Sequence, residues 1–335
     1  MSFRILLVML SFLAACTSVH AGPVRHYAFF GQDREKLPAM KAFLDDPDFE
    51  GAQVTYTWKQ LEPDFGLYDF GDVDADLALL ASHGKRLFIQ LQDVTFSPKR
   101  VCIPQYLRTR PEFHGGAEQQ YVIDRDDEKT ARPEGWVARR WDPAVQTRFH
   151  ALCKVLGERY DGRIAGINLP ETAVEFGSTG KLFPAGFTPT RYCDAIVANM
   201  RALRACFRKS VVMQYANFMP GEWLPDSDRG YLKRVYAAAQ ESGISIGAPD
   251  LLPLRKAQRD HAYPLIASLS AFLPNGIAVQ DGNYDDVDKA SGKKITVGEL
   301  YRFAADTLHV TYVFWCIEEP YFLRDVIPFL ESMRR

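Results

Sequence analysis

The sequence has little excess of charge, few cysteines and no long apolar run after its first residues. Lys and Arg total 40 against 42 Asp and Glu, so we expect no nucleic-acid-binding surface, which would need a basic excess. No C-x-x-C motif and no histidine cluster occurs, so we predict no metal site and no cofactor. Beyond the N-terminus, no apolar stretch reaches the about 20 residues that span a bilayer. The 335 residues are therefore expected to fold as a globular chain with a large core.

Five cysteines follow the first 21 residues: Cys102, Cys153, Cys193, Cys206 and Cys316. An odd number leaves at least one thiol unpaired, and the pairing of the others stays open. Cys153 and Cys193 fall among apolar positions of helical segments. We therefore expect these cysteines to act as small buried apolar side chains.

Residues 1–21 have the pattern of an export signal. A positive charge precedes the apolar segment Ile5–Ala15, which is too short to span a bilayer. Cleavage after Ala21 would release the chain, whereas the lipobox Leu13–Cys16 would limit the signal to residues 1–15 and place a lipid on Cys16. We therefore predict an exported bacterial protein, either a cell-envelope lipoprotein or a periplasmic or secreted protein. Its only contact with a membrane would be this possible lipid anchor.

Short apolar segments of strand character alternate with amphipathic helical segments after the signal. Asp142-Pro143 and Thr188-Pro189 are typical of helix starts, and Gly84 is typical of a position just after a helix. The expected strands are His26–Phe30, Ala52–Thr57, Arg86–Gln92, Ile164–Leu169, Ser210–Ala216, Ile244–Gly247, Ile277–Gln280 and Val310–Cys316.

Eight strand-and-helix units predict one α/β domain, a (β/α)8 TIM barrel, over residues 22–335. The alternative is an open doubly wound sheet, which should carry a glycine-rich phosphate turn after its first strand; Phe30–Asp33 does not supply one. The third unit contains a long insertion, roughly Asp93–Trp141. Because barrel active sites lie at the carboxyl ends of strands, we expect this insertion beside the active site.

The residues near the ends of the expected strands are rich in carboxylates, amides and aromatics. They include Trp58, Glu62, Gln90, Gln92, Asp93, Glu171, Gln214, Tyr215, Asn217, Asp250, Gln280, Asp281, Trp315, Glu318 and Glu319. No lysine closes a strand, so a Schiff-base mechanism is not expected. Carboxylic acids can protonate a glycosidic oxygen and stabilise an oxocarbenium-like centre, while aromatic faces stack on sugar rings. These side chains favour carbohydrate chemistry.

The segment Trp58–Phe70 resembles the W..LEP..G.YDF segment after the second strand in barrel glycoside hydrolases of clan A, the β-galactosidase-like and endoglucanase-like families. The similarity continues through Trp141–Pro143 to the fourth strand and thins after Gly186. The resemblance implies that Glu171, just after the fourth strand, is the general acid/base. It also implies that Trp315 forms the floor of a sugar subsite.

Two positions depart from that pattern. Pro170 precedes Glu171, where these families have Asn, and Gln280-Asp281 closes the seventh strand, where they have a nucleophilic Glu. If Gln280 holds the nucleophile's place, the usual retaining mechanism fails. We take Asp281 as the leading second carboxylate and Glu318 as the next.

Several strand-end residues also have structural interpretations. Glu62 is expected to cap a turn or pair with an arginine, Asp250 to cap the following helix, and Trp58 either to pack in its loop or to bind substrate. The predicted substrate contacts are Trp315, Trp58, Gln92, Gln90, Tyr215 and Gln280.

These features together predict an exported glycoside hydrolase that cleaves a poly- or oligosaccharide with two carboxylates. Burial beside a second carboxylate should raise the pKa of Glu171, as a general acid requires. The alternative is a non-catalytic carbohydrate-binding barrel that has lost the nucleophile, which Gln280 would explain. The expected partner is a carbohydrate in both cases, and nothing in the sequence indicates an oligomeric state.

Overall fold

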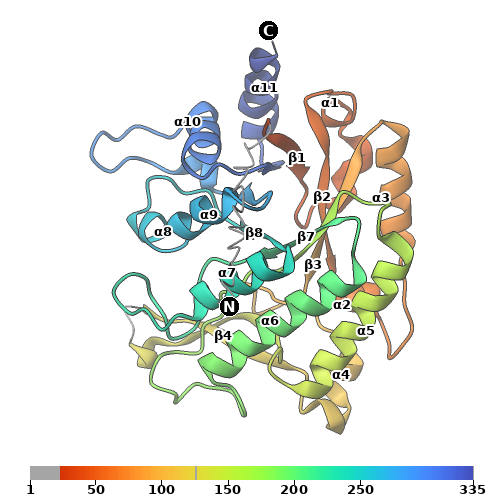
Figure 1. The fold of residues 1–335 in the computed structure, drawn as a ribbon, viewed down its shortest axis with the longest axis vertical. Coiled ribbons are helices and arrows are strands. Elements are labelled where there is room, and N and C mark those ends of the chain that lie inside the picture. The colour runs from red at the N-terminus through yellow and green to blue at the C-terminus, as the bar shows by residue number, and fades with distance from the viewer. Residues whose placement is uncertain (1–22, 125–126, 335) are drawn as a thin grey trace, which may run out of the picture.

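A closed barrel of eight parallel strands forms the centre of the computed structural model, which describes residues 23–124 and 127–334 (Figure 1). The predicted signal, with Cys16, lies outside the described residues. The barrel strands, in their order around the barrel, are β1 (Arg25–Phe29), β10 (Tyr312–Cys316), β9 (Gly276–Val279), β8 (Ser245–Ala248), β7 (Val211–Tyr215), β6 (Gly166–Leu169), β3 (Arg86–Gln92) and β2 (Phe49–Thr57). The predicted TIM-barrel fold is confirmed, and each barrel strand overlaps a predicted one.

Helices connect the strands and cover the outside of the barrel. Neighbouring helices α5, α6 and α7 pack side by side (Figure 1). The α-helices are α1 (Lys41–Leu44), α2 (Trp58–Leu61), α3 (Gly71–Ser82), α4 (Gln105–Thr109), α5 (Pro143–Tyr160), α6 (Pro189–Cys206), α7 (Tyr231–Ser242), α8 (Lys256–Asp260), α9 (Tyr263–Ser270), α10 (Val297–Arg302) and α11 (Ile327–Met333). The 3-10 helices are η1 (Arg34–Ala39), η2 (Pro111–Phe113), η4 (Glu128–Thr130) and η5 (Asn283–Asp285). Two π-helical turns are η6 (Phe303–Thr307) and η7 (Phe322–Val326). No helix in these described parts is both long and apolar enough to cross a bilayer.

The predicted helix starts are confirmed at α5 and α6. The Asp142 carboxylate accepts hydrogen bonds from the first backbone N–H groups of α5, and the Thr188 hydroxyl accepts one from Arg191 N in α6. The first unit differs from the prediction of a full helix after every strand. Between β1 and β2 only η1 and the single turn α1 form, and Pro38 lies inside η1, where proline prevents a longer regular helix.

The insertion after β3 has secondary structure of its own. Strands β4 (Ala117–Val122) and β5 (Arg132–Ala138) form an antiparallel hairpin outside the barrel. Thr95 and Trp136 exchange backbone hydrogen bonds, and Tyr121 N donates to Glu175 O. The hairpin is therefore attached both to the end of β3 and to the chain that follows β6.

The barrel strands separate two cores by side-chain alternation. Aromatic residues of the inward face fill the lumen, with Tyr27, Phe88 and Phe314 packed ring to ring. Gly166 provides room for them, because a Cβ there would lie 2.6 Å from the Phe88 ring. The outward face, which includes Ile167, belongs to the larger core under the helices. A filled lumen leaves the carboxyl ends of the strands as the place for a site.

Candidate active site

Glu171 lies two residues beyond β6, at the carboxyl end of the barrel. Strand alternation groups it with Ile167 and Leu169, which face the helices. The strand ends at Leu169, however, and the Glu171 carboxylate meets Asn217 from the end of β7. The break in the strand thus brings the carboxylate to the mouth, which alternation alone would not do.

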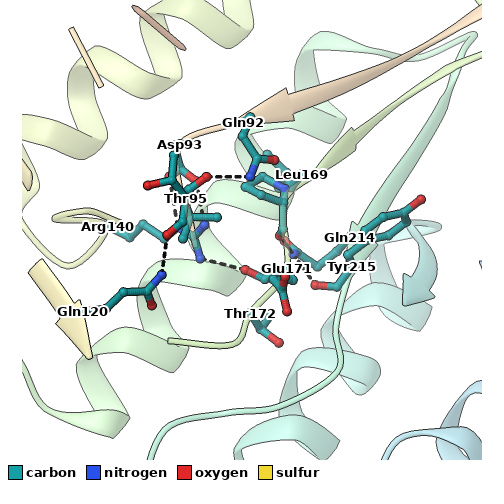
Figure 2. A network of polar contacts seen from close by, with 12 residues as sticks. Gln92, Asp93, Thr95, Gln120, Arg140, Leu169, Glu171, Thr172, Gln214 and Tyr215 are labelled. Carbon is teal, nitrogen blue, oxygen red and sulfur yellow. Dashed lines mark hydrogen bonds and ion pairs between the residues drawn. The ribbon is translucent and has the colours of Figure 1, made fainter. Parts of the chain in front are cut away.

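Among residues 23–124 and 127–334, an amide binds the Glu171 carboxylate and no cation forms an ion pair with it. Asn217 Nδ2 donates to its Oε2 at 2.6 Å, and Asn217 Oδ1 accepts from Phe218 N at 2.9 Å. Arg140 Nη1 donates to the backbone oxygen of Glu171 at 3.0 Å (Figure 2). Arg140 therefore supports the main chain of Glu171, and the Glu171 carboxylate is left to Asn217.

Arg140 is itself fully engaged beneath the mouth. Its guanidinium forms a two-pronged ion pair with Asp93, with distances of 2.6 and 2.9 Å, and both side chains are 3% exposed. It also donates to the Tyr192 hydroxyl at 2.6 Å, and that hydroxyl donates to Thr172 O at 3.0 Å. This buried network fixes the main-chain carbonyl groups of Glu171 and Thr172.

The surroundings of Glu171 raise its pKa to about 7. Burial is the largest cause, and the negative charges of Asp250 and Glu134 act in the same direction. The Asn217 hydrogen bond and the charge of Arg140 oppose the shift. The predicted upward shift is confirmed, so Glu171 holds a proton in a substantial fraction of molecules at neutral pH.

Asp250 is another carboxylate at the carboxyl end of the barrel, and its negative charge acts on Glu171. It follows β8, it is half-buried, and Asn283 Nδ2 donates to its Oδ1 at 3.1 Å. Burial raises its pKa. The prediction that Asp250 caps the next helix is wrong, because α8 begins after Arg255 and that cap makes no side-chain hydrogen bond.

Asp281 and Glu318 form a different acidic group, at the ends of β9 and β10. Asp281 is exposed, and Glu318 accepts a hydrogen bond from Gly282 N at 2.9 Å. Burial raises the pKa of Glu318, with Asp281 and Asp285 as the neighbouring charges. The charges that act most on the pKa of Glu171 come from Asp250, Arg140 and Glu134, and the catalytic roles of Asp281 and Glu318 stay predictions.

Three predicted sugar contacts are corrected because their side chains are enclosed. Trp315 is 0% exposed and faces the helices, where its Nε1 donates to His26 Nδ1 at 3.1 Å. Tyr215 is 1% exposed in the lumen, and its hydroxyl accepts from Gln53 Nε2 at 2.8 Å. Trp58 is 0% exposed and packs edge-on against Phe149. None of the three has a face left for a sugar ring.

The Trp58–Phe70 segment is a structural element of this barrel. Trp58 Nε1 donates to Glu62 Oε2 at 2.9 Å, Gly66 N donates to Glu62 Oε1 at 3.0 Å, and Arg148 of α5 forms an ion pair with the same carboxylate. Glu62 is 0% exposed. The prediction that Glu62 pairs with an arginine is confirmed.

The amide side chains predicted to contact substrate differ in how far they are exposed. Gln90 is 8% exposed and accepts from Thr55 Oγ1 at 2.6 Å. Gln92 and Gln280 are half-buried, and Gln92 Nε2 donates to Val94 O (Figure 2). Gln92 and Gln280 thus retain side-chain surface for a substrate, and their role stays a prediction.

The cysteines carry no paired or metal-binding chemistry in the described structure. All five are free, with Cys102, Cys153 and Cys193 buried. Within residues 23–124 and 127–334, no three His, Cys, Asp or Glu side chains come together in a way that could hold a metal ion. The polar side chains around Glu171 that could contact a substrate are therefore carboxylates and amides.

Solved structures with a similar fold include a β-amylase, a GH5_18 protein and a β-galactosidase. The catalytic domain of β-amylase from Paenibacillus polymyxa aligns with 88% of this chain and 92% of its own, at a TM-score of 0.55 and 7% identity. A GH5_18 protein from Streptomyces cattleya in complex with Manb1-4GlcNAc aligns with 88% of this chain and 70% of its own, at a TM-score of 0.52 and 14% identity. A β-galactosidase from Halorubrum lacusprofundi aligns with 87% of this chain and 52% of its own, at a TM-score of 0.52 and 16% identity, so this chain spans about half of that protein.

Comparison at the level of sequence finds no relative. No protein-family model matches the chain, and no curated protein matches it. The resemblance to clan A glycoside hydrolases is confirmed for the barrel fold alone.

Proposed function

We propose that this chain is a glycoside hydrolase in which Glu171 is the general acid. The observation that carries the proposal is the Glu171 carboxyl, which lies at the mouth with a pKa raised to about 7 and is bound by the Asn217 amide. A carboxylic acid of this pKa keeps its proton near neutrality and can give it to a departing oxygen. The barrel fold shared with sugar-cleaving enzymes supports the same chemistry.

The reaction needs a proton donor and a second carboxylate. Glu171 gives its proton to the glycosidic oxygen as the bond from that oxygen to the anomeric carbon breaks. Water supplies the hydroxyl of the new reducing end, and its other proton passes to one of the two carboxylates, so that Glu171 is protonated again for the next cycle. We assign the second carboxylate to Asp250 in place of Asp281, because the negative charge of Asp250 already acts on Glu171. Asn283 orients Asp250 through the amide hydrogen bond to its Oδ1.

One observation favours a second function, a carbohydrate-binding barrel without turnover. The seventh barrel strand, β9, is followed by Gln280, where the resembled families carry a nucleophilic Glu. Gln280 N donates to Asn283 Oδ1 at 3.0 Å, so this end of β9 is used to position Asn283. A protein of this kind would bind oligosaccharides and release no product.

Turnover of defined sugars distinguishes the two functions. Cellohexaose, xylohexaose, mannohexaose and maltohexaose are incubated with wild-type protein and with Glu171→Gln, and products are separated by chromatography. We expect cleavage of at least one hexaose by the wild type and a loss of about 10²–10⁴-fold in Glu171→Gln, the contribution of general acid catalysis. An aryl glycoside with an activated leaving group should recover part of that loss, because its departure needs no proton.

The matched control is Glu241→Gln, which removes a carboxylate from the exposed end of α7. It should cleave at the wild-type rate. Full activity of Glu171→Gln would refute the assignment of the acid, and hexaose binding without cleavage by the wild type would support the binding barrel. Proton NMR of the first product then distinguishes direct attack by the second carboxylate from attack by an activated water.

Export remains part of the proposal. The N-terminal pattern supports either a lipid on Cys16 or cleavage after Ala21. Mass spectrometry of the mature protein from a bacterial host separates the two, because only the lipoprotein has an acylated N-terminal cysteine. A cytoplasmic protein that retains residues 1–21 would contradict export.

A further inference from the structure

The loop between β7 and α7 carries an exposed tryptophan on a stack of rings. Trp223 is 48% exposed, and its ring lies nearly parallel to that of Phe218, at 12° and 5.2 Å between centroids. Phe218 in turn stacks on His261, at 27° and 4.7 Å, and Trp223 also contacts His261 directly, tilted by 37° with 5.5 Å between centroids. Single exposed apolar side chains are common on protein surfaces, but Trp223 is the exposed member of a cluster of three rings in mutual contact, which we call the ring stack.

The loop that holds Trp223 is fixed before any ligand arrives. Trp223 and Ser227 exchange two backbone hydrogen bonds, at 3.0 and 2.7 Å. The Glu222 carboxylate is 6% exposed and accepts three backbone N–H groups, from Arg229, Tyr231 and Leu232, at 2.8–2.9 Å. The indole therefore needs little ordering to bind a flat partner.

The same loop is joined directly to the proposed acid. Asn217, whose amide binds the Glu171 carboxylate, precedes Phe218 in the chain. Thr172, which follows Glu171, donates from its hydroxyl to Phe218 O at 2.7 Å. The ring stack and the acid thus share one rigid support at the carboxyl end of the barrel.

We propose that the exposed face of Trp223 is a stacking platform for one pyranose ring of an oligo- or polysaccharide whose scissile bond lies at Glu171. This proposal rests on the proposed function for the position of the bond. A sugar ring has an apolar C–H face that fits an indole, and its hydroxyls remain free for water or amides. Because the platform stands beside the acid, the substrate must have at least two sugar units to occupy both.

Binding to protein that cannot cleave tests the platform. In the Glu171→Gln background, calorimetry measures the affinities of cellohexaose, xylohexaose, mannohexaose and maltohexaose with and without Trp223→Ala. We expect the best hexaose to bind about tenfold more weakly without the indole, the effect of losing one aromatic contact. The control Phe272→Ala removes an aromatic that is 57% exposed just after α9, at the other end of the barrel, and should leave the affinity unchanged.

Fluorescence gives a signature that a structural role would not produce. Trp58, Trp141 and Trp315 are at most 4% exposed, and Trp136 of β5 is half-buried, so an emission change upon saccharide binding is assigned to Trp223 by comparing the wild type with Trp223→Phe. In Trp223→Phe the emission change should be lost while most of the affinity remains, because a ring is still present.

Two results would overturn the platform: equal hexaose affinity with and without Trp223→Ala, or no binding of any of the four hexaoses. Failure of the hydrolase proposal is separate from both. Hexaose binding that depends on Trp223, without product release by the wild-type protein, would refute hydrolysis and leave the platform in place.

Discussion

The raised pKa of Glu171 predicts a pH-dependent stability that can be measured without a substrate. In the unfolded chain this carboxyl has its ordinary pKa of 4.5, and in the folded chain burial raises it to about 7. Between these values the folded protein binds more protons than the unfolded one, so raising the pH destabilises the fold. Below pH 4.5 both states are protonated, and this contribution is fully present.

The size of the effect follows from the shift. Each pKa unit corresponds to about 1.36 kcal/mol, so the shift of Glu171 corresponds to at most about 3 kcal/mol. The value is an upper limit because solvent reaches part of the side chain. Glu171→Gln removes the titration, so the stability of the wild type relative to this variant should fall by up to that amount as the pH rises from 4.5 to about 7.

Urea unfolding, followed by circular dichroism at a series of pH values, measures this difference. The control Glu241→Gln removes an exposed carboxylate and should keep the pH dependence of the wild type. A difference between wild type and Glu171→Gln that is independent of pH, or that grows with pH, would refute the buried, protonated Glu171 on which the mechanism depends.

Three further predictions concern groups around the acid. Asn217→Ala removes a hydrogen bond to the charged Glu171 carboxylate, worth about 1.5–3 kcal/mol, so the pKa of Glu171 should rise. The alkaline limb of the kcat/KM profile should then move up by about one pH unit or more, and a downward move would contradict the geometry. Arg148→Met leaves Glu62 buried and unpaired and should cost about 3–5 kcal/mol in urea unfolding; a loss below about 1 kcal/mol would contradict the pairing. Asp250→Asn should abolish most cleavage while Asp281→Asn retains it, and the reverse order in a hexaose assay would restore Asp281 as the second carboxylate.

The residues of the site show where local pattern stops being informative. Glu171 shares the alternation of Ile167 and Leu169, which face the helices, and only the end of β6 at Leu169 turns its carboxylate to the mouth. Trp315 is placed by the same alternation beside Val313, under the helices. A pattern of apolar residues predicts that both are near the strand end but not which side of the barrel each one faces.

The partners of Glu171 come from segments that are far away in the chain. Asn217 follows β7, Asp250 follows β8, and Arg140 ends the insertion. Nothing local marks Asn217 or Arg140 as contacts of Glu171. For Asp250, the sequence predicts only that it caps the following helix. Strand order could have indicated Asn217, since β6 and β7 are neighbours in the barrel.

The sequence by itself determined the eight barrel strands and the starts of α5 and α6, because these depend on short-range physics: alternation within strands, helical spacing and caps such as Asp142. Glu171 as the candidate acid came from the resemblance to clan A glycoside hydrolases. Tertiary structure alone decided that Trp315 is enclosed, that the charges of Asp250 and Glu134 act on Glu171, and that Trp223 is exposed on the ring stack. The reason is that barrel closure brings together loops from different strands, and their contacts depend on side-chain direction and burial, which no single segment encodes.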